Sequence, residues 1–383
     1  MSITDDAKGQ RGLIRERNSQ ILPLRGIPVT NMAIDIRIKN VEPIASPEEI
    51  ARKYPLSPAS QEFILSAREV VNNIVKGNDR RLLAIIGPCS IHDPRAALDY
   101  AQRLKGLADK VGDVMFVVMR TYFEKPRTVV GWKGLILDPD MDGSYNIQKG
   151  IEVARELLVK LTDLRLPLGC EVLDPIIPQY IDELMSWSSI GARTTASQTH
   201  RNLASGLSVA VGFKNSTDGD VGVAINAIKS ARNPAAFIGI DKNGMSAVYH
   251  TTGNDCGHLI LRGGGGSPNY YEDDVEAARK AMTAAGLEPS IVIDCSHANS
   301  NKQWQRQARV LRSVVDQVCW GEKSIRGFML ESFLQNGHQD IPSDISQLEY
   351  GKSVTDECVG WTETERLVLR AAQLLRQGEE KPL

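Results

Sequence analysis

The stretch LLAIIGPCSIHDPRAALDYAQRLKGLADKV, residues 82–111, decides the fold. It begins with a short apolar run that is typical of a buried strand. After a Gly-Pro pair it continues into an amphipathic pattern over 94–111 that favours a helix. The same change from strand to helix recurs along the chain, and this alternation predicts a parallel sheet covered by helices.

Seven more apolar, β-branched runs follow the first one. They occupy 114–120, 166–173, 189–193, 207–214, 258–263, 290–297 and 325–332. Eight strands that alternate with helices indicate an α/β protein with a closed (β/α)8 TIM barrel. We find no sequence repeat beyond this alternation.

Two segments are additions to the predicted barrel of residues 61–383. Residues 1–60 read as an N-terminal extension with a possible short strand at 35–41, ahead of a helix over 57–77 that Ser57 caps and Gly77 ends. Residues 236–250 read as an inserted β-hairpin with Asn243 and Gly244 in its turn. Two interpretations of this hairpin remain open: it makes contacts for regulation or oligomer assembly, or it is a surface addition without a function.

Composition limits the class of protein. The formal net charge of −2 over 383 residues leaves no basic excess for nucleic acid. The chain has no apolar run of about 18 residues and no secretion signal, so we expect no membrane span. Its six cysteines show no paired spacing, which indicates reduced thiols and a cytoplasmic protein.

Every predicted strand carries a reactive or charged residue at or near its end. In a barrel these carboxyl ends share one face, where active sites lie. In strand order the residues are Cys89, Arg120, Glu171, Arg193, Lys214, Arg262, His297 and Glu331. Each one alone is ordinary at a solvated strand end, but eight together favour a functional site.

The four cations in this set, Arg120, Arg193, Lys214 and Arg262, predict a site for a multiply charged anion such as a phosphorylated carboxylic acid. The loop 120–134 is also basic and is either a second phosphate site or a solvated surface loop. The glycines at 263–266 lack the Lys-Ser/Thr of a P-loop, so we read them as backbone freedom beside an anion site.

The remaining reactive residues suit a divalent metal such as Mn, Fe, Co or Zn. Cys89, His297 and Glu331 offer a thiolate, an imidazole and a carboxylate, and a fourth ligand comes from Asp356 or Glu357. A nucleophilic triad of cysteine, histidine and a carboxylate is the rival interpretation. Four basic groups weaken that rival, because acyl transfer does not require them.

The motifs GPCSIHDP, YFEKPRT, GWKGLI, IGARTT, GFKN, LRGG, SHANS and GKSVTD resemble those of the class I 3-deoxy-D-arabino-heptulosonate 7-phosphate (DAHP) synthases, in the same order from about residue 35 onward. These enzymes are (β/α)8 barrels. They condense phosphoenolpyruvate with erythrose 4-phosphate in the first step of the shikimate pathway. The chain differs at TASQTHRN and RGGGGSPNY, where no assigned residue is lost.

The resemblance implies a role for each matched residue. The implied metal ligands are Cys89, His297, Glu331 and Asp356, with Cys89 and His297 also counted as catalytic together with Lys125. The implied contacts of phosphoenolpyruvate are Arg120, Lys125, Gly191, Ala192, Arg193, Lys214 and Arg262. Erythrose 4-phosphate is expected at Arg127 and Thr128.

Regulation also follows from the resemblance. Many family members are inhibited by an aromatic amino acid, and the implied contacts here are Asp35, Ser208, Phe237 and Gly239. Glycine at position 239 favours tyrosine as the effector. We expect a homodimer or homotetramer. The alternatives are a synthase for another aldose phosphate, a sugar-phosphate hydrolase, and a non-catalytic aromatic amino acid sensor on the same barrel.

Overall fold

The computed structural model describes residues 35–127 and 131–379. By its internal contacts the chain divides into residues 1–44 and residues 45–383. The described part of the first unit is irregular. A turn, in which the N–H of Ile38 donates to the carbonyl of Asp35, opens it. The short strand predicted over 35–41 is therefore wrong, because Asp35 has a left-handed φ of 59° and no described strand pairs with this segment.

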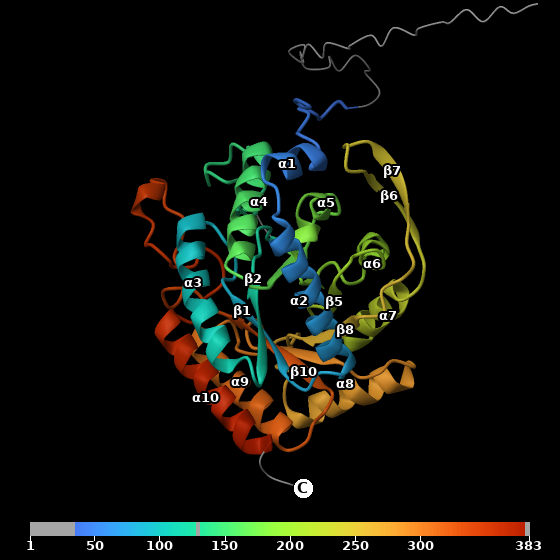
Figure 1. Cartoon of the computed structure of the whole chain (residues 1–383), viewed down its shortest axis with the longest axis vertical. Helices are drawn as coiled ribbons and strands as arrows, with labels where there is room; N and C mark the ends of the chain where they lie inside the picture. The colour runs from blue at the N-terminus through green and yellow to red at the C-terminus, as the bar shows by residue number, and fades with distance from the viewer. Residues whose placement is uncertain (1–34, 128–130, 380–383) are drawn as a thin grey trace, which may run out of the picture. The chain divides into compact units, whose positions relative to one another are not determined.

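The second unit is a closed eight-stranded parallel barrel (Figure 1). Its strands are β1 (Leu82–Gly87), β2 (Met115–Arg120), β3 (Leu168–Val172), β4 (Trp187–Ile190), β5 (Ala210–Lys214), β8 (Gly257–Leu261), β9 (Ile291–Asp294) and β10 (Ile325–Glu331). Each neighbours the next around the barrel, and β10 pairs with β1 to close it. The (β/α)8 fold is thus confirmed.

Two strands, β4 and β9, end three residues earlier than predicted. β4 ends at Ile190, because the chain turns at Gly191, whose carbonyl accepts the N–H of Thr194. β9 ends at Asp294, and His297 lies in the following loop with a left-handed φ of 54°. Both Arg193 and His297 therefore stand on loops just beyond a strand rather than on the strand itself.

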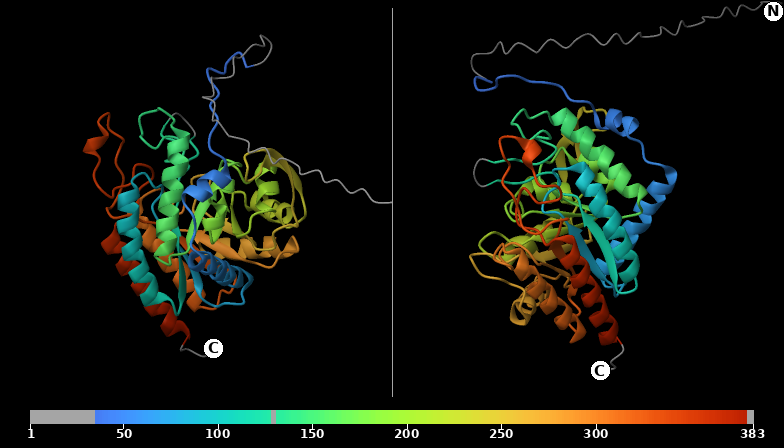
Figure 2. Two further views of the ribbon diagram at one scale, coloured as in Figure 1. Left: turned by 45° about the horizontal axis from the view of Figure 1, so that its top comes forward. Right: turned by 90° about the vertical axis from the view of Figure 1, so that its left-hand side faces the viewer.

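Helices surround the barrel (Figures 1 and 2). They are α1 (Pro47–Lys53), α2 (Pro58–Lys76), α3 (Pro94–Val111), α4 (Ile147–Asp163), α5 (Pro178–Ile181), α6 (Gln198–Ala204), α7 (Val221–Ala231), α8 (Glu272–Ala284), α9 (Trp304–Cys319) and α10 (Trp361–Glu379). The predicted ends of α2 are confirmed: the Ser57 side chain accepts the N–H of Ser60, and Gly77 adopts the left-handed C-cap. None of the described helices is long and apolar enough to cross a bilayer.

The barrel interior is packed, so it is not a pore. Leu83, Trp187, Ile260 and other buried side chains fill it. Val71 and neighbouring apolar residues of α2 pack against the same cluster. Because side chains fill the interior, the cavity that the strand ends share lies beyond their carboxyl ends.

The predicted hairpin is present and lies outside the barrel sheet. β6 (Ala236–Ile240) pairs antiparallel with β7 (Ser246–His250), and Gly244 takes a positive φ of 79° in the turn. The hairpin contacts α6 through β6. Ile238 and Val248 pair across it and are exposed.

Candidate active site

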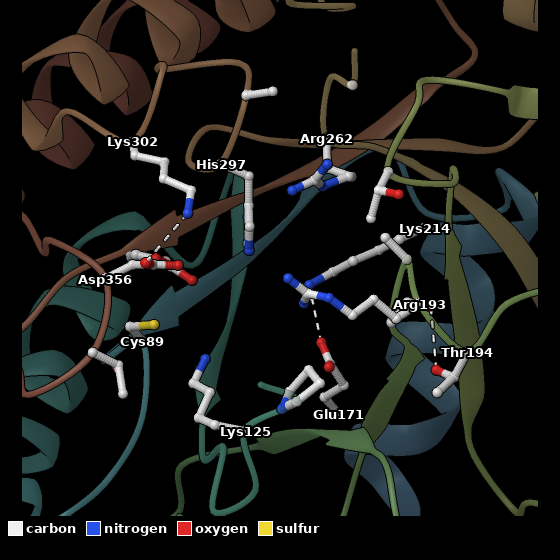
Figure 3. A pocket seen from close by; sticks show the side chains of 18 of the residues that line it. Cys89, Lys125, Glu171, Arg193, Thr194, Lys214, Arg262, His297, Lys302 and Asp356 are labelled. Atoms are coloured by element: carbon white, nitrogen blue, oxygen red, sulfur yellow. Dashed lines mark hydrogen bonds and ion pairs between the residues drawn. The ribbon is translucent and has the colours of Figure 1, made fainter. Parts of the chain in front are cut away.

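One cavity of about 450 Å³ gathers the predicted site residues (Figure 3). Its lining includes Cys89, Arg120, Lys125, Arg127, Gly191, Ala192, Arg193, Lys214, Arg262, His297, Glu331 and Asp356. Thr128 lies outside the described residues. The eight strand-end residues of the sequence analysis, Glu171 among them, all reach this cavity.

The cationic wall contains donors that have no partner. Arg120 is fully buried at the end of β2, where one Nη atom lies 2.9 Å from Oε1 of Glu331 and its guanidinium carbon lies 4.0 Å from the centre of the Tyr122 ring. Its other Nη atom and Nε of Arg262 are buried without a hydrogen-bond acceptor. Buried donors are rarely left unpaired, so these two indicate an anionic ligand.

The two lysines of the wall stay positively charged. Nζ of Lys214 lies 3.0 Å from Oε2 of Glu171. Burial lowers the pKa of Lys214, but Glu171, Tyr122 and Asp294 together outweigh burial and raise it overall. Desolvation likewise lowers the pKa of Lys125, but the charges of Cys89 and Glu331 oppose it and the pKa is raised overall. The cavity therefore presents lysine ammonium groups rather than neutral amines.

Two glycines let the backbone approach these groups closely. A side chain on Gly191 would place its Cβ 2.7 Å from Oε1 of Glu171, so this carboxylate would have to shift from its position beside Lys214. Gly134 has a φ of 111°, and a Cβ there would overlap the carbonyl of Phe123. That close approach fixes the loop that carries Lys125, whose N–H donates to the carbonyl of Lys133.

Three predicted metal ligands converge beside the cations. The donor atoms of Cys89, Glu331 and Asp356 all lie within 4.8 Å of one another. Oε2 of Glu331 is buried without a hydrogen-bond partner. Burial and the Glu331 charge raise the pKa of the Cys89 thiol, a penalty that a bound cation would remove. A thiol and two carboxylates fit a divalent metal of borderline softness.

Asp356 and Glu357 point to different places. Asp356 lines the cavity, whereas Oε2 of Glu357 accepts the N–H of Trp304 at 3.0 Å. Glu357 therefore binds the first residue of α9 and is turned away from the three-donor group. The geometry favours Asp356 as the fourth candidate ligand.

His297 lines the same cavity but is not in the group of donors within 4.8 Å. Its Nδ1 lies 2.9 Å from Oδ2 of Asp294 and 2.8 Å from Oγ of Ser296. Figure 3 shows the other edge of the ring directed into the pocket. His297 can therefore present its free nitrogen to an ion that the other three ligands hold.

Sequence reasoning missed two groups at this site. Lys302 lines the cavity, and its Nζ lies 4.0 Å from Oδ1 of Asp356 (Figure 3). Asp294 is fully buried between His297 and Lys214. Lys302 has a left-handed φ of 58°, and no residue pattern in the sequence predicts such a turn at this position. Asp294 is the first residue of the DCSH segment, residues 294–297, and its acidic side chain at the end of an apolar run was the signal that could have found it.

Glu124, the residue before Lys125, supplies a pH prediction. It is 6% exposed, and burial followed by the charge of Asp174 raises its pKa to about 8. The folded chain thus keeps this proton up to about pH 8, whereas the unfolded chain releases it near the ordinary value of 4.5. Because the folded state binds more protons in this window, stability falls as pH rises through it.

We expect Glu124→Gln to remove this dependence. Relative to the wild type, the variant gains up to about 4 kcal/mol of unfolding free energy at pH 8.5 and little at pH 4.5. Urea denaturation at both pH values measures the difference. Glu62→Gln, an exposed change on α2, is the control. Equal stability of the Glu124 variant and the wild type at every pH would contradict the prediction.

Comparisons with known proteins agree with this geometry. The DAHP synthetase I family matches residues 53–369. The chain is 51% identical to the Tyr-sensitive phospho-2-dehydro-3-deoxyheptonate aldolase of Salmonella typhimurium LT2, over 87% of this chain and 94% of that protein. It is 48% identical to the Phe-sensitive enzyme of Escherichia coli K12, over 89% of this chain and 97% of that protein.

A solved structure is similar over most of its length. The phospho-2-dehydro-3-deoxyheptonate aldolase of Francisella tularensis SCHU S4 superposes with a TM-score of 0.86 at 45% identity, covering 88% of this chain and 98% of that one. The family match alone spans well over half of the sequence. The chain belongs to the DAHP synthetase I family.

Proposed function

We propose that this chain condenses phosphoenolpyruvate with erythrose 4-phosphate and water to give DAHP and phosphate, as the first step of the shikimate pathway. One observation carries the proposal. A single cavity holds unpaired buried donors on Arg120 and Arg262 and an unpaired buried acceptor on Glu331. Anion and cation sites side by side suit a reaction that joins an anionic substrate to a metal-activated carbonyl.

The cations bind and orient phosphoenolpyruvate. Arg120, Lys214 and Arg262 line one wall with Arg193. Their charge offsets the repulsion between two phosphorylated substrates, and their fixed positions hold the reacting carbons together. Arg127, whose Nε donates to the carbonyl of Trp132 at the cavity rim, is placed for the phosphate of erythrose 4-phosphate.

A divalent metal, one of Mn, Fe, Co or Zn, supplies Lewis acidity toward the aldehyde oxygen when bound at Cys89, His297, Glu331 and Asp356. C3 of phosphoenolpyruvate attacks the aldehyde carbon, and C2 gains positive character. Water adds at C2, and the resulting hemiketal phosphate expels inorganic phosphate. Lys125 is charged and faces both substrate regions, so it donates a proton to the developing alkoxide.

The aromatic effector is assigned to a second cavity of about 600 Å³ on the hairpin side of the barrel. Ser208 and Phe237 line it, and the Phe237 ring stacks on Tyr249 at 5.4 Å. Arg68 and Asp182 on its wall suit the two charges of a free amino acid. Gly239 lies on β6 outside this lining, and Asp35 belongs to the other unit of the chain.

Tyrosine is the proposed effector, and the support is the glycine at 239. A side chain there would bring its Cβ to 3.2 Å from the Tyr249 ring. Assembly as a homodimer or homotetramer is also part of the proposal, supported by the exposed pair Ile238 and Val248 on the hairpin. A cytoplasmic location is supported by six free cysteines.

We expect Phe237→Ala to raise the tyrosine concentration needed for half inhibition by about tenfold, because one aromatic contact is removed. The uninhibited rate should stay within a factor of two. Trp320→Ala, which truncates an exposed aromatic ring at the end of α9, is the matched control. Unchanged inhibition in the Phe237 variant would remove the effector from this cavity.

The activity is tested by following the ultraviolet absorbance of phosphoenolpyruvate. We expect loss of absorbance only when erythrose 4-phosphate is present, abolition by EDTA, and recovery with Mn, Fe or Co. Loss without the sugar phosphate would indicate a hydrolase, and preference for a five-carbon aldose phosphate a sibling synthase. No loss with any metal would leave the amino acid sensor, which tyrosine binding by calorimetry would then examine.

A further inference from the structure

Asp294 occupies the boundary between the two halves of the cavity. It is the last residue of β9, between β8 and β10, and it is fully buried. Its Oδ2 lies 2.9 Å from Nδ1 of His297 on the metal side and 3.9 Å from Nζ of Lys214 on the phosphoenolpyruvate side. It is not among the residues that line the cavity.

The other carboxylate oxygen is occupied by the chain's own backbone and a hydroxyl. Oδ1 of Asp294 accepts the N–H of Ser296 at 3.0 Å and its Oγ–H at 2.8 Å. These two bonds fix the rotation of the carboxylate. Oδ2 makes no aligned hydrogen bond, and its nearest proton-bearing neighbours are the imidazole of His297 at 2.9 Å and the ammonium group of Lys214 at 3.9 Å.

We propose that Asp294 is a positioning residue that couples metal binding to phosphoenolpyruvate binding by orienting His297 and Lys214 together. The phosphoenolpyruvate half of this inference rests on the proposed function. The part of this inference that concerns metal binding rests only on the position of Asp294 beside His297.

The effect on His297 follows from tautomer chemistry. The Ser296 hydroxyl gives its proton to Oδ1 of Asp294, so its oxygen accepts from Nδ1 of His297, and the nearby carboxylate also favours the ring proton on that nitrogen. The lone pair then lies on Nε2, the ring edge that Figure 3 shows directed into the pocket. Carboxylates that hold ligating histidines in this way strengthen metal affinity by about 10- to 100-fold.

The effect on Lys214 is weaker, because this lysine has a second carboxylate. Glu171 lies 3.0 Å from Nζ of Lys214, closer than Asp294 at 3.9 Å. Glu171 is not in contact with His297 in any described hydrogen bond or ion pair. Both acids lie near Lys214, but of the two only Asp294 also lies beside His297. Asp294 and Glu171 are therefore a matched pair for an experiment.

The experiment compares Asp294→Asn with Glu171→Gln. Each change keeps the shape of the side chain and removes its charge. Manganese affinity is measured by calorimetry without substrates, and KM and kcat are measured with saturating manganese. We expect Asp294→Asn to weaken manganese binding by about 10- to 100-fold and to raise the KM for phosphoenolpyruvate several-fold. Glu171→Gln should raise that KM with manganese affinity unchanged.

Two outcomes overturn the proposal: wild-type manganese affinity in Asp294→Asn, or an equal loss of manganese affinity in Glu171→Gln. If Asp294→Asn does not fold, the wild-type protein still decides, because nitrogen NMR reads the His297 tautomer directly. A proton on Nδ1 supports the proposal, and a proton on Nε2 overturns it. Failure of the proposed reaction would leave the manganese and NMR results intact, so the two failures are distinguishable.

Discussion

Replacing Cys89 by serine removes the bound metal and the condensation activity together. A serine hydroxyl does not ionise at neutral pH and is a harder, weaker ligand than a thiolate, while Glu331 and Asp356 remain beside it. Since loss of an outer-shell contact already costs about 10- to 100-fold in metal affinity, loss of a direct ligand should exceed about 100-fold. Metal content after dialysis and the rate with added manganese measure both effects.

The same variant separates the two roles that the sequence left open for this cysteine. A nucleophilic Cys89 would lose activity on conversion to serine but keep its metal. A buried structural thiol would keep both. Cys170→Ser is the control, because Cys170 is also buried, touches Ser188 at 3.6 Å and does not line the cavity. Full activity of Cys89→Ser with no metal bound would reject the ligand assignment.

The grouping of the strand-end residues could be predicted, because a parallel barrel brings the carboxyl ends of all its strands to one face. Once eight apolar runs alternate with helices, geometry brings the residue after each run to one face, whatever the loops do. Residues as distant as Cys89 and Glu331 are therefore placed together by topology. The ends of α2 could be predicted equally well, because Ser57 and Gly77 cap the helix through hydrogen bonds and backbone conformation at its own ends.

The missed features depend on contacts that no local pattern encodes. DIRIKNV alternates like a strand, but alternation forms a strand only where a partner offers its backbone, and the described residues offer none. Lys302 reaches Asp356 through a left-handed backbone that sequence does not favour at lysine. Asp294 has its role only because His297 turns back toward it.

Arg120→Met is expected to destabilise the fold and to abolish phosphoenolpyruvate binding. Methionine keeps an unbranched apolar stem, but it removes the guanidinium group 4.0 Å from the centre of the Tyr122 ring and leaves Glu331 buried without its partner at 2.9 Å. Breaking a buried ion pair from one side costs about 3 to 5 kcal/mol. Urea denaturation measures that loss, and calorimetry with phosphoenolpyruvate measures the loss of binding.

The double variant Arg120→Met with Glu331→Gln distinguishes stability from recognition. Removing both charges leaves no unpaired buried ion, so most of the lost unfolding free energy should return. Phosphoenolpyruvate binding should not return, because both variants lack Arg120 and with it the buried Nη atom that has no hydrogen-bond partner and can bind an anion. If Arg120→Met alone were as stable as the wild type, the pair would not carry charge in the folded protein. If the double variant bound phosphoenolpyruvate normally, Arg120 would be needed only for stability, and Lys214 and Arg262 would bind the anion.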